Sequence, residues 1–414
     1  MTGSGPCRWV IVADTPFLPA HGGGEREHLG FVQAAAARGL IAALVLPADD
    51  DPKAVGRDDD LEGIRRLVAP APVIVIPRKR AVRAAAFRQP YVVASRPAPA
   101  DLVDRVRVAA PDADAVVIFH YKSSGIGQRL AQGLRLPTVL RQHNLEGPYH
   151  HALAAAARFP KSWAMHGEAW RVDRDERRLE HANWLTGIAD ISASDARVRA
   201  ARSAVPVAHV PSFALGGVDG STRQPWSRPA SPVVTFVGAL DVATNHDAIR
   251  WFAEQVWPAV LTSVPNARWQ VVGRRPTEDV RSLVMATPGA ELHPDVVDPV
   301  EFLLASSAAV NPAVSGSGVN IKLVDYLSVG VPVVSTTRGM AGIGLRAEED
   351  LLVGDTAPEF AAAVVRLLTS AAEANRLGTA GQETAARILD VDTSLDALAA
   401  LLEHPQHSSE APAR

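Results

Sequence analysis

Residues 314–334 read VSGSGVNIKLVDYLSVGVPVV, and this stretch decides the fold. A short apolar segment precedes it, and a glycine-rich turn opens it. A helical pattern then runs from about residue 319 to residue 329, and Gly330 supplies a stop for that helix. The apolar run 331–334 begins another buried strand. The order of strand, glycine turn, helix and strand predicts a parallel α/β unit.

Gly316, Ser317 and Gly318 lie where the first strand feeds the helix. Backbone N–H groups at such a turn, together with the positive end of the helix dipole, favour an anion. Lys322 and Asp325 are three residues apart, so they share one helix face. A cation for a diphosphate beside a carboxylate for ribose hydroxyls suits a nucleotide sugar. A tight turn with a surface ion pair gives the same spacing, and the spacing leaves both interpretations open.

The composition sets the class of protein that we expect. The chain has 414 residues, of which 47% are hydrophobic, and this is enough for two domains with substantial cores. The net charge of −3 gives no reason to expect a nucleic-acid partner. Cys7 is the only cysteine, which excludes an internal disulfide and a cysteine-rich zinc site. Arg8 and Asp14 interrupt the first apolar run, so we expect no signal peptide. No stretch is apolar enough to span a membrane, and we therefore expect a cytoplasmic protein.

The N-terminal half begins with a β–loop–α–β pattern. Residues 8–13 (RWVIVA) predict a buried strand, residues 25–38 a helix and residues 41–46 a second strand. Gly22 and Gly23 belong to a run of three glycines where the loop meets the helix. Glycines there let a ligand phosphate approach the backbone closely. A flexible loop tip is the alternative.

Two histidines are predicted at the ends of buried strands. His120 ends the strand 115–120, and His143 lies near the end of the strand 138–144. Parallel sheets bind ligands at the carboxyl ends of their strands, so both histidines are site candidates, and we favour His143. A hydrogen-bonded packing histidine is the alternative for each.

Two further stretches of the N-terminal half are notable for composition. Residues 78–96 contain six basic residues and no acidic one, which fits a solvated helix face or contact with an anionic acceptor or membrane surface. Residues 154–181 predict one long helix, in which we interpret Trp163 and Trp170 as packing aromatics.

The chain divides into two halves with the same rhythm of strands and helices. Residues 1–211 form the N-terminal domain, and the Pro/Gly-rich stretch 212–230 is interpreted as a linker. Residues 231–403 form the C-terminal domain, and the polar tail 404–414 is predicted to be disordered. Both halves therefore predict doubly wound parallel sheets of the α/β class.

These residues resemble the GT-B glycosyltransferases of the large retaining family 4, over nearly the whole chain. The resemblance rests on Gly22 and Gly23 with the prolines before them, on residues 143–146 (HNLE), on Gly238 and on the block 316–334. It implies two Rossmann-like domains that face a cleft. The C-terminal domain would bind a nucleoside diphosphate sugar, and the N-terminal domain would bind the acceptor. The implied reaction is transfer of the sugar to an acceptor hydroxyl, with retention of configuration and without a metal or another cofactor.

The resemblance also assigns the site residues. The implied catalytic residues are His143, Lys322 and Asp325. The implied donor contacts are Gly22, Gly23, Gly238, Arg274, Gly316, Ser317, Gly318, Lys322 and Asp325.

The chain departs from the family pattern in the C-terminal domain. The two glutamates of the family signature fall on Ser317 and Asp325, so only the second position keeps a carboxylate. The arginine and lysine that many members carry after the first glycine of this domain are replaced by Ala239 and Thr244. Lys322 would then stabilise the diphosphate, with help from Arg274 or the arginine after it.

Two other functions remain open from the sequence. A nucleotide-sugar 2-epimerase would use the same fold without an acceptor. A non-catalytic nucleotide-sugar-binding partner protein would explain the replacement at Ser317. For a transferase, the acceptor could be a polysaccharide, a lipid-linked intermediate or a small metabolite.

Overall fold

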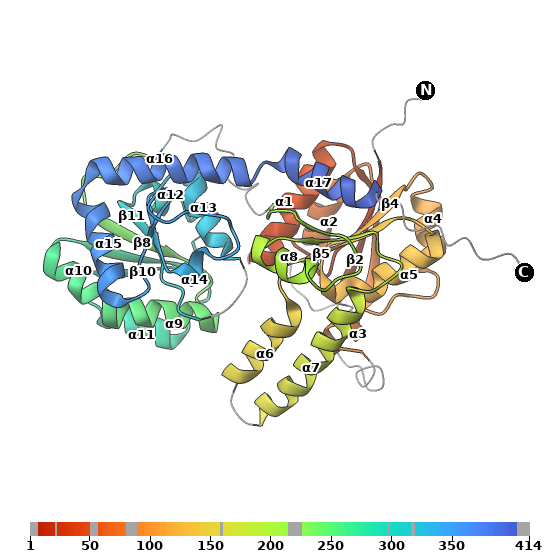
Figure 1. The fold of residues 1–414 in the computed structure, drawn as a ribbon, viewed down its shortest axis with the longest axis horizontal. Helices are drawn as coiled ribbons and strands as arrows, with labels where there is room; N and C mark the ends of the chain where they lie inside the picture. Colours follow the sequence, from red (N-terminus) through yellow and green to blue (C-terminus); the bar gives the residue numbers. More distant parts are fainter. Residues whose placement is uncertain are drawn as a thin grey trace, which may run out of the picture. The chain divides into compact units, whose positions relative to one another are not determined.

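The computed structural model describes residues 7–20, 23–49, 57–79, 89–157, 160–213, 226–296, 298–315 and 319–403. The chain forms two compact units (Figure 1). Unit 1 comprises residues 1–214 and 391–414, and unit 2 comprises residues 215–390. Several predicted positions lie outside the described residues, namely Gly22, Gly316, Ser317, Gly318, the tail 404–414, residues 80–88 of the basic stretch and residues 214–225 of the linker.

Unit 1 is built on a parallel seven-stranded sheet with the order β3-β2-β1-β4-β5-β6-β7. Its strands are β1 (Trp9–Val12), β2 (Ile41–Asp49), β3 (Val73–Arg78), β4 (Ala115–Ile118), β5 (Thr138–Gln142), β6 (Gly187–Asp190) and β7 (Val207–His209). Its helices are α1 (Gly23–Ala37), α2 (Arg57–Val68), α3 (Tyr91–Ala94), α4 (Leu102–Ala109), α5 (Ser124–Leu134), α6 (Glu146–Ala156), α7 (Lys161–Leu179), α8 (Ala193–Ala200) and α17 (Val391–Glu403).

Both faces of this sheet are buried, which explains why its strands are apolar without alternation. In β1, Trp9 and Ile11 enter one core layer. Val10 and Val12 enter the layer on the other face. Successive side chains of a strand point to opposite faces, so a continuous apolar run requires cover on both.

Unit 2 repeats the architecture with a parallel six-stranded sheet of order β10-β9-β8-β11-β12-β13. Its strands are β8 (Val233–Val237), β9 (Arg268–Gly273), β10 (Ala290–Pro294), β11 (Ala308–Asn311), β12 (Val333–Ser335) and β13 (Leu352–Val353). Its helices are α9 (Ala243–Trp251), a π-helical turn (Phe252–Val256), α10 (Trp257–Ser263), α11 (Glu278–Ala286), α12 (Val300–Leu304), α13 (Ile321–Val329), α14 (Thr337–Met340), α15 (Ala357–Thr369) and α16 (Ala371–Ile388). The doubly wound α/β prediction is therefore confirmed for both units.

The stretch that decided the prediction forms α13 and its flanking strands, as expected. Gly330 ends the helix in the left-handed conformation, with φ of 82°, which a residue with a side chain adopts only under strain. Leu323 and Leu327 bury the inner face of the helix in the unit 2 core. This inner face fixes the orientation of the helix beside β11.

The C-terminal helix corrects the predicted domain boundary. We assigned residues 391–403 to the C-terminal domain, but α17 packs on β5, β6 and β7 of unit 1. Leu395, Leu398 and Leu401 enter the unit 1 core. A Cβ at Gly187 would lie 2.8 Å from the Cβ of Leu401, so a glycine is needed there for the helix to dock. The boundary was wrong because the sequence pattern of a helix does not reveal which sheet it covers.

The predicted long helix 154–181 is also corrected. Two antiparallel helices, α6 and α7, occupy this region and lie side by side at the edge of unit 1 (Figure 1). Trp163 is 81% exposed and Trp170 is 57% exposed, so the interpretation of both as packing aromatics is wrong. None of the helices in the described ranges is long and apolar enough to cross a bilayer.

Candidate functional site

The strand order of unit 2 reverses between β8 and β11, its two central strands. The chain crosses from β8 to β9 on one side and from β11 to β12 on the other. Open parallel sheets bind ligands in the crevice that such a reversal leaves at the carboxyl ends of the strands. Helices α9 and α13 follow β8 and β11, so their first turns flank this crevice.

Lys322 spans the switch point from the first turn of α13. Its Nζ donates to the Oδ1 of Asn245 on α9 at 2.5 Å. The Nδ2 of Asn245 in turn donates to the carbonyl oxygen of Ala239 at 2.8 Å, which fixes the amide. The Lys322 ammonium also lies 4.6 Å from the centre of the Phe236 ring, a cation–π distance. The lysine is therefore held in one place before any ligand arrives.

The surroundings of Lys322 disfavour its protonated form. Desolvation in this partly buried position lowers the pKa of the lysine to about 7. The neighbours described above are an amide oxygen and an aromatic ring, neither of which carries a full negative charge. An anion placed beside the ammonium would favour its charged form and raise the pKa again. Binding of an anion here would thus be coupled to uptake of a proton.

Two glycines allow close packing at the ends of β8 and β9. A Cβ at Gly273 would lie 1.8 Å from the carbonyl oxygen of Gly238, a distance that no side chain tolerates. A Cβ at Gly238 would press on the Asn245 amide at 3.1 Å and on the Phe236 ring at 3.2 Å. The predicted Gly238 therefore lies beside the residue that holds Lys322.

Asp325 lies one turn after Lys322 and is buried, with 6% of its surface exposed. The following residue anchors this turn of α13 to β8. The Tyr326 hydroxyl accepts from the backbone N–H of Val237 at 2.8 Å and donates to the carbonyl oxygen of Val237 at 3.0 Å. The helix face with Lys322 and Asp325 is thereby fixed against the end of β8. The role of Asp325 as a ribose ligand stays a prediction.

Arg274 and Arg275 follow β9 and differ in availability. Arg275 pairs with Asp241 at 3.0 Å, and its backbone N–H donates to Asp295. The Arg274 side chain is partly exposed and makes no hydrogen bond or ion pair with any residue that the structure describes. Of the two, Arg274 is therefore the more available cation, and its predicted role at a diphosphate stays a prediction.

Unit 1 has its own switch point, between β1 and β4, and a charged cluster surrounds Asp14 there. The carboxylate of Asp14 lies 2.9 Å from Nε2 of His28, 3.3 Å from Nζ of Lys122 and 3.7 Å from Arg96. Burial alone would raise the pKa of Asp14, but His120, His28 and Lys122 outweigh it and hold that pKa well below its usual range. Arg96 is buried, so it does not belong to the solvated helix face weighed for residues 78–96.

His143 lies at the centre of this cluster. Its ring centre is 4.7 Å from that of His120 and 5.9 Å from that of His28. Burial, followed by the charge of the neighbouring histidines, lowers the pKa of His143 well below its usual range, so the imidazole is neutral at ordinary pH. Its Nε2 is buried and has no hydrogen-bond partner in the described part of the chain. A neutral, unpartnered imidazole nitrogen suits a hydroxyl group of a sugar or acceptor.

Glu146 joins the cluster from the first turn of α6. One carboxylate oxygen of Glu146 lies 3.9 Å from Nε2 of His120, and the other lies 3.6 Å from Nε2 of His150. The start of α6 is held by Glu176, which accepts from the backbone N–H groups of Glu146 and Gly147 at 3.0 and 2.9 Å. The buried guanidinium of Arg199 donates to Glu176 at 2.9 Å. This network fixes α6 relative to the histidines.

Sequence reasoning brought together Lys322 and Asp325 but missed their partners. The pairing of Asn245 with Lys322 left no signal in the sequence, since it depends on how α9 and α13 lie beside each other. Asp14 lies two residues after β1 and Lys122 four residues after β4, and the rule that favoured His143 could have found them. His28 gave no such signal, because it lies on helix α1 and does not follow a strand.

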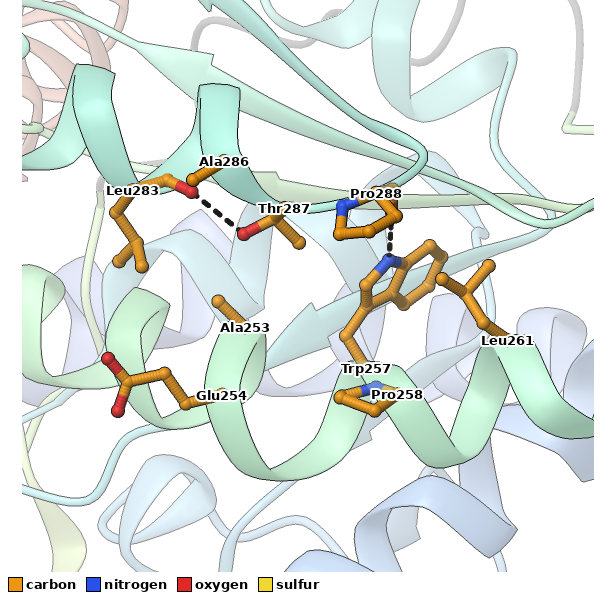
Figure 2. A pocket seen from close by; sticks show the side chains of 9 residues that line it. All are labelled: Ala253, Glu254, Trp257, Pro258, Leu261, Leu283, Ala286, Thr287 and Pro288. Carbon is orange, nitrogen blue, oxygen red and sulfur yellow. Dashed lines mark hydrogen bonds between the residues drawn. The ribbon is translucent and has the colours of Figure 1, made fainter.

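A groove on unit 2 does not suit a nucleotide. It measures 290 Å³ and is lined by α10, the π-helical turn and the end of α11 (Figure 2). Trp257, Leu261 and Leu283 make its walls apolar, and Glu254 is its charged residue. Residues 286–288 immediately precede β10, so the groove lies at the amino end of the sheet. A diphosphate would meet a carboxylate there and no cation.

A family model and a curated relative each match part of the chain. Residues 231–370 match the family model of the group 1 glycosyl transferases. A Klebsiella pneumoniae relative, described as an uncharacterized 44.6 kDa protein in the cps region, is 25% identical over 139 residues. That match covers 32% of this chain and 36% of the relative.

Solved structures of known proteins match both units together. HepE from Anabaena, crystallised with UDP and glucose, covers 96% of this chain and 99% of its own at 14% identity, with a TM-score of 0.63. Sucrose-phosphate synthase from Thermosynechococcus elongatus covers the same shares at 16% identity, with a TM-score of 0.65. A glycosyltransferase from Rickettsia africae covers 97% and 100% at 10% identity, with a TM-score of 0.64. The chain therefore has the GT-B fold, and these matches with the family model support a glycosyltransferase.

Proposed function

We propose that this protein transfers a sugar from a nucleoside diphosphate sugar to an acceptor hydroxyl, with retention of configuration. The observation that carries the proposal is the Lys322–Asn245 contact across the switch point of unit 2, inside the stretch that matches group 1 glycosyl transferases. UDP in the structurally similar HepE supports a nucleoside diphosphate as the leaving group.

Lys322 would neutralise the diphosphate as the bond to the sugar breaks. Negative charge develops on the leaving group in that step, and a preorganised cation lowers the barrier because it needs no rearrangement. Arg274 would add a second positive charge from the end of β9. Asp325 would accept the ribose hydroxyls. With this charge met by protein, the proposed reaction requires no metal.

His143, in unit 1, would form a hydrogen bond with a hydroxyl group of the sugar or of the acceptor. The neutral Nε2 can accept a hydrogen bond from a hydroxyl, or donate one in the other tautomer. Lys122 and His28 hold Asp14 as a carboxylate beside it, so the cluster offers both donors and acceptors. Such a mixed set fits a polyhydroxy acceptor, whether a polysaccharide, a lipid-linked intermediate or a small metabolite.

The first experiment measures UDP release from UDP-glucose and other nucleotide sugars with a panel of acceptors. Lys322→Ala should lower kcat/KM by roughly 100- to 1000-fold, the usual effect of removing one stabilising group from a leaving-group site. Arg275→Ala is the matched control, because this nearby arginine is engaged by Asp241. Equal turnover of the wild type and Lys322→Ala would refute the role of the lysine.

The same assay separates the alternatives. A nucleotide-sugar 2-epimerase would convert its substrate with no acceptor present. A non-catalytic partner protein would bind the nucleotide in calorimetry and turn over none of the acceptors. Ser317→Glu restores the carboxylate of the family signature. A gain in activity would mark the serine as a lost catalytic group, and a loss would mark it as the working residue.

A further inference from the structure

The outer surface of α7 exposes two indole rings, which is unusual for side chains of this size. Trp163 is 81% exposed and Trp170 is 57% exposed. The inner surface of the same helix is buried through Ala169, Val172 and Glu176. One side of the helix therefore packs against unit 1, and the opposite side exposes the two tryptophans to solvent.

The exposed residues of α7 fall on a single stripe. With 3.6 residues per turn, side chains three, four or seven positions apart share a face. The stripe comprises Trp163, His166, Trp170, Arg174, Arg177 and Arg178, and we call it the α7 outer face. The two tryptophans are two turns apart, so the face extends along most of the helix.

The charge of the α7 outer face has one sign. Arg174 stacks on Trp170, with its guanidinium carbon 5.0 Å from the ring centre. Stacking uses the flat face of the guanidinium and leaves its N–H edges free for an anion. The side chains of Arg174 and Arg178 make no hydrogen bond or ion pair with residues that the structure describes.

The acidic residues of α7 all have partners within unit 1, and one of these partners, Arg177, belongs to the α7 outer face. Glu176 is buried, and the other three acidic residues are partly exposed. Glu168 accepts from Arg171, Asp173 accepts from Arg177, and Asp175 accepts from the Tyr121 hydroxyl. The α7 outer face thus combines indole rings with three arginines, of which Arg177 is paired with Asp173 while Arg174 and Arg178 supply the net positive charge.

We propose that the α7 outer face docks unit 1 on the surface of an anionic lipid bilayer. Tryptophan favours the headgroup region, where its ring is buried and its N–H stays wet. Arginine binds the phosphates of anionic lipids, and each such residue near the surface strengthens binding about fivefold. Helices that lie in the interface have this combination of an aromatic and a basic face. The proposal does not depend on the proposed sugar transfer.

The test is cosedimentation of the full chain with vesicles of equal parts phosphatidylcholine and phosphatidylglycerol. The wild type should bind, and it should bind less well to pure phosphatidylcholine and at high salt. Trp163→Ser with Trp170→Ser should weaken binding about tenfold or more. Met285→Ser is the matched control, because Met285 is 83% exposed but lies on α11 of unit 2.

A second pair of variants tests the charge separately. Arg174→Glu should lower binding to the anionic vesicles by more than fivefold, since it removes a cation and adds a like charge to that of the lipid. Arg250→Glu makes the same change in net charge on α9 of unit 2 and should have little effect. Unfolding curves of all variants should coincide with that of the wild type, because the changed side chains are exposed.

Four results would overturn the proposal. The wild type could fail to bind anionic vesicles, or the double tryptophan variant could bind as well as the wild type. Light scattering could instead show a wild-type dimer that the double variant dissociates, and the face would then be a self-interface. Binding of soluble oligosaccharides lost in the double variant, with no vesicle binding, would assign the tryptophans to carbohydrate.

Discussion

The depressed pKa of Lys322 makes nucleotide binding depend on pH in a defined direction. In the free protein the pKa is about 7, so about half of the molecules carry the ammonium at neutral pH. A bound diphosphate should return the pKa toward the ordinary lysine value. Only the protonated form then binds well, so affinity is highest below the free pKa and falls as the pH rises above it.

The size of the effect follows from this linkage. Raising the pH from about 7 to about 8.5 lowers the protonated fraction, and UDP affinity with it, ~15-fold. At neutral pH, binding should also take up about half a proton, which calorimetry in two buffers of different ionisation enthalpy detects. Lys322→Met should bind UDP more weakly and without this pH dependence. Arg274→Gln is the control: it should weaken binding and keep the pH dependence, since the lysine remains.

A UDP affinity that is constant over this pH range in the wild type would refute the reasoning. So would a pH dependence that survives in Lys322→Met. Either result would mean that the ammonium does not meet the diphosphate, whatever the loss of affinity in the variant.

Three further predictions concern stability and turnover. Leu398→Ala should lower the free energy of unfolding in urea by about 3 kcal/mol, because the side chain is fully buried where α17 meets the unit 1 sheet. Val391→Ala, at the exposed start of the same helix, should lower it by less than about 1 kcal/mol. Glu27→Gln should lower the free energy of unfolding by about 3 to 5 kcal/mol, since Glu27 is the carboxylate partner of the fully buried Arg141. An unfolding midpoint equal to that of the wild type would contradict this account. His143→Ala should lower kcat about 100-fold with an unchanged Kd for UDP, because the histidine belongs to unit 1, and a parallel loss of UDP affinity would place it at the donor instead.

The buried ion pair of Glu27 and Arg141 also fixes where the chain leaves unit 1. Arg141 donates to the carbonyl oxygens of Val210 and Pro211, and Glu27 accepts from the backbone N–H of Phe213 at 2.6 Å. Residues 210–213, which follow β7, are thus held against α1 and β5 by hydrogen bonds. Sequence analysis gave no hint of this contact, since its residues are distant in the chain.

Local patterns in the sequence were sufficient for most of the elements, although they missed the break between α6 and α7. The apolar run before residue 314, the helical spacing after it and the glycine at position 330 predicted β11, α13 and β12. They also placed Lys322 and Asp325 one turn apart. This succeeded because helix period, strand period and glycine stops depend on residues a few positions apart. For the same reason, the strand-end rule correctly brought His120 and His143 to one edge of the unit 1 sheet.

The contacts that make a site depended on the order of strands in space, which no local period contains. Lys322 meets Asn245 across 77 residues of chain only because β8 and β11 are neighbours. His28 meets Asp14 because α1 folds back over β1. The burial of a side chain was equally undetermined, since Trp163 and Leu398 both occur in helical patterns, yet one faces solvent and the other a sheet. The sequence by itself determined most of the segments that became strands and helices, and only the tertiary structure decided which of their faces met.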